Sequence, residues 1–242
     1  MKTKRFLSLA LTLALVFGLS VIPLTVTAED DAGQFYGDTL LDEYIEENYH
    51  GKITVTIAAS RPVENSRIAV DAKSLDAGHT FIRLDSGGGD VIVKGFSGAY
   101  KMSHTEFINN ATIEGALADE AGHEWNAAVV YEITLEQANR VKAYIDGFDI
   151  AHFNVVSDNC TKFAVGALIA AGIEPPTREH VWTLPPRDEV LKGIPSFIPN
   201  KEMLADVLLN IAYYGYTPAD AVQDFKAAPN CVLKYDGALH KP

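Results

Sequence analysis

Hydrophobic and polar residues alternate along several short stretches of the chain, and this two-residue period predicts β-strands. In Lys52–Ala59, for example, Ile53, Val55 and Ile57 alternate with polar neighbours. Comparable stretches predict four more strands, which are Arg67–Lys73, His79–Asp85, Asp90–Phe96 and Ala127–Thr134. Since only the glycine-rich Ser86–Gly89 separates two of them, we expect a β-hairpin there.

Helical patterns dominate the second half of the chain. "TLEQANRVKAYIDGF" begins with Thr134 and carries Gln137 three residues later, which is a capping-box pattern that opens a helix. Another helix is predicted from Cys160 to Gly172. Its apolar positions share one face, formed by Phe163, Ala164, Ala167, Leu168 and Ala171.

Further helices are predicted at residues 38–49, Lys201–Tyr214 and Pro218–Lys226. The second of these is expected to pack on the core through Met203, Val207, Leu208 and Ile211. The proline-rich segment 174–200 is expected to be extended, without helix or strand. The chain is therefore predicted to be α+β, with an antiparallel sheet and packed helices in a single domain, residues 29–242, whose proline-rich C-terminal extension starts at about residue 174.

The first 28 residues resemble a secretory signal peptide. A basic cluster precedes an apolar run over residues 6–26, and "VTA" then supplies small residues before an acidic pair. The run is long enough to span a bilayer, so a retained anchor is the alternative. Pro23 and the cleavage-like "VTA" favour removal. The mature protein is therefore predicted to be secreted, without a stable membrane anchor.

Composition narrows the range of partners. The formal net charge is −12, and residues 1–28 contribute only basic charges, so the remainder is more acidic still. Such a surface argues against nucleic acid, anionic membranes and wall polymers as main partners. "GHEWN" starts like a metalloprotease helix but has Ala127 where the second histidine should stand, and no cofactor or metal is predicted.

Cys160 is a candidate nucleophile. It follows Ser157, Asp158 and Asn159, all good helix N-caps, and a thiol in the first turn of a helix is stabilised as thiolate by the helix dipole. His79, at the start of a strand and directly after a glycine, is the candidate base. Taken alone, Cys160 is better explained as a small buried hydrophobic residue.

Four segments in order carry a family resemblance: "AGHTFIRL", the glycine hairpin, "YEITLEQANRVKAYI" and "FNVVSDNCTKFAVGALIAAGI". Together they resemble the circularly permuted branch of the NlpC/P60, papain-like thiol hydrolases, in which the histidine strand precedes the cysteine helix. The resemblance covers roughly Ile53–Pro176. It implies a permuted papain-like architecture, Cys160 as nucleophile, His79 as base, and a peptide or acyl-amide substrate, with cell-wall peptides a natural choice for an exported protein.

The resemblance also implies a polar residue that orients the histidine, often on the next strand of the hairpin. If Leu84 faces Asp90, then His79 falls opposite Lys94, Gly95 and Phe96, none of which is suitable. Other candidates, unranked, are Glu132, His104 and Asp158.

Two alternatives to hydrolysis stay open. Because the permuted branch includes lipid-acting members, the same acyl-enzyme could pass its acyl group to an amine or a lipid. In the other alternative the chain is a silent binding domain in which Cys160 is joined to Cys231 by a disulfide. The oligomeric state is not predicted.

Overall fold

The computed structural model describes residues 39–233 except 195, 197 and 198. All of these lie within one compact unit, Phe35–Pro242. The predicted signal peptide, residues 1–28, lies outside the described residues. Among the helices that are described, none has the length and apolar character needed to cross a membrane.

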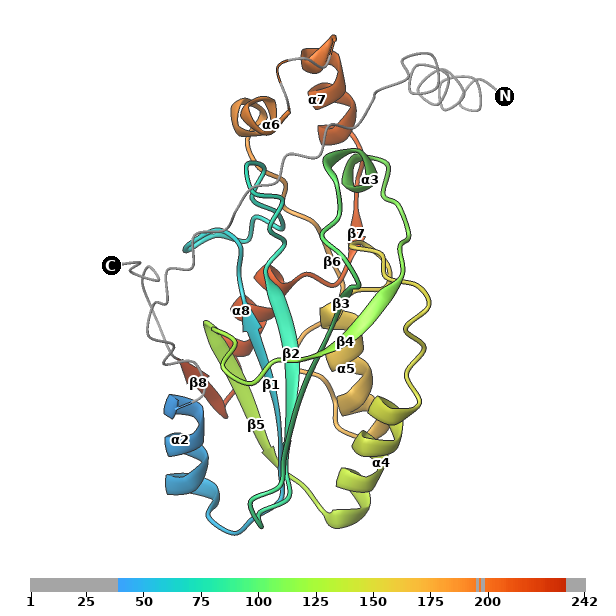
Figure 1. The fold of residues 1–242 in the computed structure, drawn as a ribbon. Helices are drawn as coiled ribbons and strands as arrows, with labels where there is room; N and C mark the ends of the chain where they lie inside the picture. Colours follow the sequence, from blue (N-terminus) through green and yellow to red (C-terminus); the bar gives the residue numbers. More distant parts are fainter. Residues whose placement is uncertain (1–38, 195, 197–198, 234–242) are drawn as a thin grey trace. The chain divides into compact units, whose positions relative to one another are not determined.

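A six-stranded antiparallel sheet organises the domain, with strand order β4-β3-β2-β1-β5-β8 (Figure 1). Its strands are β1 (Thr54–Ser60), β2 (His79–Asp85), β3 (Val91–Gly98), β4 (Gly115–Asp119), β5 (Ala127–Glu132) and β8 (Cys231–Leu233). A separate two-stranded sheet pairs β6 (His180–Val181) with β7 (Tyr214–Gly215). Six of the seven residues of the central strand β1 are buried, because helices cover both faces of the sheet.

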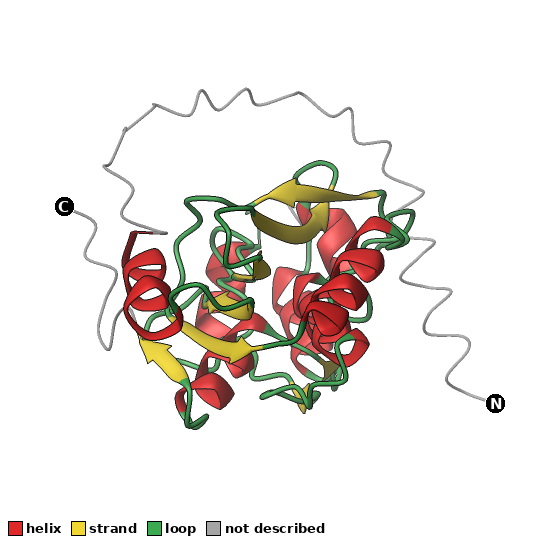
Figure 2. Ribbon diagram, turned by 90° about the horizontal axis from the view of Figure 1, so that it is seen from below, coloured by secondary structure: helices red, strands yellow, loops and turns green. Residues whose placement is uncertain are grey.

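Seven helices are described. They are α2 (Thr39–Tyr49), α3 (His104–Ile108), α4 (Leu135–Asp146), α5 (Cys160–Ala170), α6 (Arg187–Gly193), α7 (Lys201–Leu209) and α8 (Pro218–Lys226). Helices α4, α5 and α8 form the larger core with one face of the sheet, and α2 packs on the opposite face through Leu41 and Ile45 (Figure 1). Figure 2 gives the view from below, with helices in red and strands in yellow.

Most predicted elements are confirmed. The fold is α+β with an antiparallel sheet, and the hairpin of β2 and β3 turns at the predicted glycines. Helix α4 begins with the predicted capping box between Thr134 and Gln137. Helix α5 begins at Cys160, its predicted apolar face is buried, and Gly172 beyond it has a φ of +74°. Helix α8 has the predicted bounds.

Three predictions about the chain are wrong. Arg67–Lys73 forms turns instead of a strand, with one isolated bridge from Ile68 to Thr183. The proline-rich segment 174–200 contains β6 and α6, although its prolines keep both short. Helix α7 ends at Leu209, and its expected core residues Met203, Val207 and Ile211 are exposed. The inward side of α7 is instead formed by Ala205, Leu208 and Leu209.

Two strands of the sheet were not predicted. Strand β4 consists of "GALAD", whose small residues give no strong alternation, and β8 is only three residues long. Short edge strands receive little stabilisation from local sequence preferences, since pairing with a neighbouring strand determines their conformation. The missed strand β4 matters most, because it leads directly into the candidate site.

Candidate active site

Cys160 is the first residue of α5, and the side chain of Asn159 caps this helix. The Asn159 amide oxygen accepts a hydrogen bond from Lys162 N at 3.0 Å. Its nitrogen donates to the carbonyl oxygens of Val155 at 2.8 Å and Tyr216 at 2.9 Å. One side chain thereby fixes the start of the helix to the preceding loop and to the segment before α8. The first N–H groups of α5, those of Cys160 and Thr161, have no partner inside the helix.

His79 is the first residue of β2, and its side chain lines the same cavity as Cys160 and interacts with the thiol closely enough that each shifts the pKa of the other, so the structure brings the two predicted site residues together. The neighbouring residues hold the strand and the helix in register, because the hydroxyls of Thr80 and Thr161 lie 2.8 Å apart and are buried. Gly78, with a φ of +71°, lets the chain turn into the strand directly before His79. Both site side chains are largely shielded from solvent.

The third polar group at the site is Glu120, which was not among the predicted candidates. Its Oε1 lies 3.0 Å from His79 Nε2, although the ring N–H does not point straight along this line. Glu120 directly follows β4 and reaches His79 past Gly95 of the intervening strand. A Cβ atom on Gly95 would meet both His79 Nε2 and the Glu120 side chain. The glycine therefore leaves the space through which the carboxylate approaches the imidazole.

The observed register of the β2–β3 hairpin differs from the expected one by two residues. Leu84 pairs with Ile92 rather than Asp90, and Phe81 pairs with Gly95. Of the other candidates, Glu132 forms an ion pair with Lys52 and Asp158 forms one with Lys162. His104 begins α3, and its side chain is outside what the structure describes. The "DEAGHEW" turn contains Glu120 in the sequence, but its proximity to His79 can be inferred only if the pairing of β4 with β3 is known.

The ionisation of the three groups is coupled. Burial lowers the pKa of His79, but the hydrogen bonds and charges of Cys160 and Glu120 outweigh it and raise the pKa to about 10. Burial raises the pKa of the Cys160 thiol, but His79, the Thr80 backbone and Thr161 outweigh this effect, so the pKa is lowered. Burial also opposes ionisation of Glu120, yet contacts with His123 and His79 lower its pKa to about 2. The arrangement therefore favours a thiolate, an imidazolium and a carboxylate.

A cavity of about 120 Å³ opens at the Cys160 and His79 side chains. Its wall includes Phe96, Trp182 and Tyr216, and it is mainly apolar. Trp182 belongs to the C-terminal extension, so this segment contributes to the site. A group bound here would meet the thiol in surroundings with little water, where charge interactions are strong.

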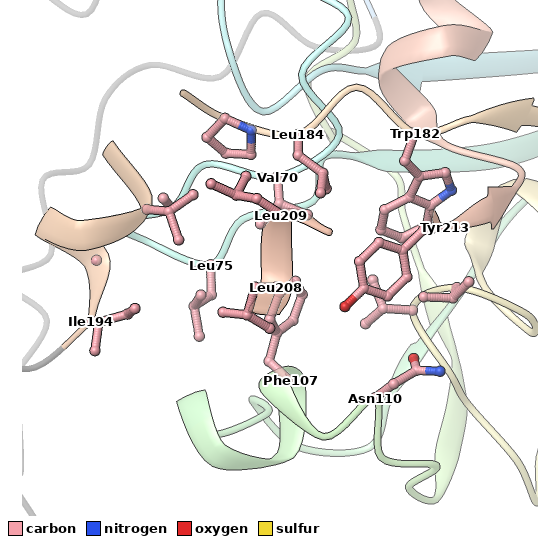
Figure 3. Close-up of a pocket in the computed structure, with 16 residues that line it drawn as sticks. Val70, Leu75, Phe107, Asn110, Trp182, Leu184, Ile194, Leu208, Leu209 and Tyr213 are labelled. Carbon is pink, nitrogen blue, oxygen red and sulfur yellow. The ribbon is translucent and has the colours of Figure 1, made fainter. Parts of the chain in front are cut away.

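A second, strongly apolar pocket of about 90 Å³ adjoins this cavity, and both are lined by Val155 and Trp182. Figure 3 shows Leu208 and Leu209 of α7 extending into the pocket above Phe107 of α3, with Trp182 beside Tyr213. The Trp182 and Tyr213 rings lie 5.6 Å apart. Apart from Asn110 and the polar atoms of these two rings, the lining side chains are apolar.

No group of three His, Cys, Asp or Glu side chains in the described part of the chain is arranged to hold a metal ion. No family model, curated protein or solved structure matches this sequence.

Proposed function

We propose that this protein is an exported thiol hydrolase of the permuted NlpC/P60, papain-like type, which cleaves an amide or peptide bond through an acyl-enzyme on Cys160. The observation that carries the proposal is the pairing of Cys160 and His79 in one cavity at the N-terminus of α5, with Glu120 3.0 Å from Nε2 of the imidazole. A nucleophile, a base and a group that orients the base are the three parts such catalysis requires.

In the proposed reaction, the Cys160 thiolate attacks the carbonyl carbon of the substrate and forms a C–S bond. The developing oxyanion accepts hydrogen bonds from the unpaired N–H groups at the start of α5. The His79 imidazolium then gives its proton to the leaving amine as the C–N bond breaks. Since Nε2 of His79 faces Glu120, Nδ1 is the ring nitrogen available to the thiol.

Water completes the cycle. It attacks the thioester carbonyl while neutral His79 accepts one of its protons, and the acid is released as the thiolate and imidazolium return. The net reaction adds one water molecule to one amide and gives an acid and an amine. Glu120 stays ionised throughout and stabilises the charged imidazole in both half-reactions.

The apolar pocket beyond Trp182 and Val155 supports a second candidate, in which the acyl group is a hydrocarbon chain and an amine or lipid can replace water as acceptor. Each buried methylene contributes about 0.8 kcal/mol, or about fourfold in kcat/KM. A series of p-nitrophenyl esters with two, four and eight acyl carbons tests this candidate. Rates that rise with chain length would support it, and equal rates would favour a peptide substrate. Product analysis with and without an added amine separates hydrolysis from acyl transfer.

Two tryptophan substitutions on α7, one that fills the pocket and one that does not, serve as matched variants for that series. Leu208→Trp adds bulk inside the pocket, whereas Val207→Trp adds the same ring on the exposed side of α7. The first variant should abolish the preference for longer chains while leaving the two-carbon ester unaffected. The second should behave like wild type, and loss of the preference in both would contradict a role for the pocket.

The proposal as a whole is tested by alkylation. Iodoacetamide is applied between pH 4 and pH 9 without reductant, and mass spectrometry locates the modified cysteine. Fast labelling of Cys160 well below pH 8, slowed in His79→Ala, would support the proposal. Both cysteines are free in the structure. Labelling only after reduction, with an intact mass two units higher on reduction, would instead support the binding-domain alternative with a Cys160–Cys231 disulfide.

A further inference from the structure

The carboxylate of Glu120 is shared by two histidines. Its Oε1 contacts His79, and its Oε2 lies 3.3 Å from Nδ1 of His123. The two imidazole rings are 4.8 Å apart at 60°, and the His123 ring also meets the Phe81 ring edge-on at 5.6 Å. His123 therefore packs on the same side of the site as His79, with Glu120 bridging the two.

The turn after β4 is shaped to bring His123 back over Glu120. The backbone N–H of His123 donates to the Glu120 carbonyl oxygen at 2.9 Å. Asp119 Oδ1 accepts a hydrogen bond from Ala121 N at 3.0 Å, and Gly122 has a φ of +87°, which glycine adopts without strain. These features fix the backbone on both sides of Glu120, so the His123 ring is directed at the carboxylate by the turn.

We propose that His123 is a positioning residue that holds the Glu120 carboxylate against His79. The inference rests on the proposed function, since it assigns a role relative to His79 as the base. A glutamate side chain has several rotatable bonds, and a single contact to His79 leaves its carboxylate free to rotate toward water. A second contact at the other oxygen removes that freedom. His123 does not reach the reacting atoms and acts through Glu120.

Exposure distinguishes the two histidines. The His123 side chain is 36% exposed and that of His79 only 14%, so His123 is the more accessible to solvent. The charged and titratable groups in contact with His123 are Glu120 on its own turn and His79 on β2, and Cys160 is coupled to it through His79. Asp119 and Glu124 are the remaining charged residues of the turn.

Two variants separate positioning from packing. His123→Leu keeps an apolar contact with Phe81 but has no N–H to donate, whereas His123→Asn places an amide nitrogen near the position of Nδ1. The measurement is the pH profile of Cys160 alkylation by iodoacetamide. We expect His123→Leu to move the alkaline midpoint of this profile, at which the His79 imidazolium loses its proton, about one pH unit lower, because a less well held Glu120 stabilises the imidazolium less. His123→Asn should bring this midpoint back to within about 0.5 pH unit of wild type.

The control is His50→Leu, which removes a histidine–glutamate contact of the same kind, His50 Nδ1 to Glu46 Oε1 at 2.5 Å, from the exposed end of α2. It should leave the pH profile unchanged. Thermal unfolding verifies that each variant is folded. If His123→Leu does not fold, His123→Ala serves as a second variant without a donor.

The outcomes separate the two proposals. A wild-type midpoint in the variants without a donor, or equal damage from His123→Asn and His123→Leu, would overturn the positioning role while leaving the proposed function intact. Failure of the wild-type protein to label at Cys160 below pH 8 would overturn the proposed function, and the inference with it.

Discussion

Gly95→Ala is expected to separate Glu120 from His79 without touching either residue chemically. A Cβ atom at this position would lie 2.8 Å from Glu120 Cγ and Oε1, and it would also collide with the His79 ring. Ordinary contacts between heavy atoms are about 3.5–4.0 Å, so the carboxylate must withdraw by about 1 Å. The His79 ring meets the added Cβ more closely still, so it must shift as well, and the methyl group then lies between the two side chains.

The size of the effect on the His79 pKa follows from the 3.0 Å distance between His79 Nε2 and Glu120 Oε1. With an effective dielectric constant of about 20, unit charges attract by about 5.5 kcal/mol at the 3.0 Å separation of His79 and Glu120, and by about 4.2 kcal/mol at 4 Å. The difference of about 1.4 kcal/mol corresponds to about one unit in the pKa of His79. Since the pKa of His79 then falls from about 10 to about 9, the alkaline step of the labelling profile, at which the imidazolium loses its proton, should move about one pH unit lower.

The assay is the second-order rate of Cys160 alkylation by iodoacetamide, measured from pH 4 to pH 11. Gly88→Ala is the matched control, because it makes the same substitution in the hairpin turn, where a Cβ would meet only Ser86 Oγ at an ordinary 3.7 Å. Thermal unfolding verifies that both variants fold. If Gly95→Ala labels at the wild-type rate across this range, the carboxylate does not support the imidazolium as argued.

Three further predictions concern the same network. Glu120→Gln should move the alkaline step of the labelling profile lower by about one pH unit or more, because the imidazolium loses its anionic partner. Since the pKa of Glu120 is lowered from 4.5 to about 2, its stabilisation of the fold is complete above pH 4.5 and is lost as the pH falls through about 2. The difference in unfolding free energy between wild type and Glu120→Gln, measured by urea titration, should therefore decrease as the pH falls from 4.5 to about 2. A difference that stays constant over this range would contradict the lowered pKa of Glu120. Asn159→Ala should lower the unfolding free energy by about 2 kcal/mol, because it removes the cap of α5 and two further hydrogen bonds, and an unchanged urea midpoint would refute this.

Local signals in the sequence predicted where His79 and Cys160 lie in their elements, and the family resemblance predicted that the two form a pair. A run of N-cap residues and a one-sided apolar face define the start and the inward side of α5. A glycine followed by alternating residues defines the start of β2. Helix ends and strands covered on both faces are fixed by short-range preferences and by burial, which a single sequence contains.

The position of Glu120 could not be obtained in the same way. It depends on the pairing of β3 with β4, and "GALAD" lacks the large apolar residues that identify a strand. The hairpin register also had to be known, and a two-residue shift leaves the hydrophobic alternation unchanged because the side-chain period of a strand is two. Helix α7 is a comparable case. Its sequence contains a helical pattern but does not show which side faces the core, and Met203 and Val207 are exposed.

The absence of a side chain at Gly95 leaves room for an orienting residue that comes from the next strand. A polar side chain on β3 would have to bridge adjacent strands over a very short distance. A glutamate that starts one strand farther away can instead extend across the glycine and reach the imidazole with its carboxylate. The base is then supported by β4, an edge strand of five residues, and by the turn that follows it. Such a strand opens more readily than the centre of the sheet, so the support of His79 depends on the least locally stabilised part of the site.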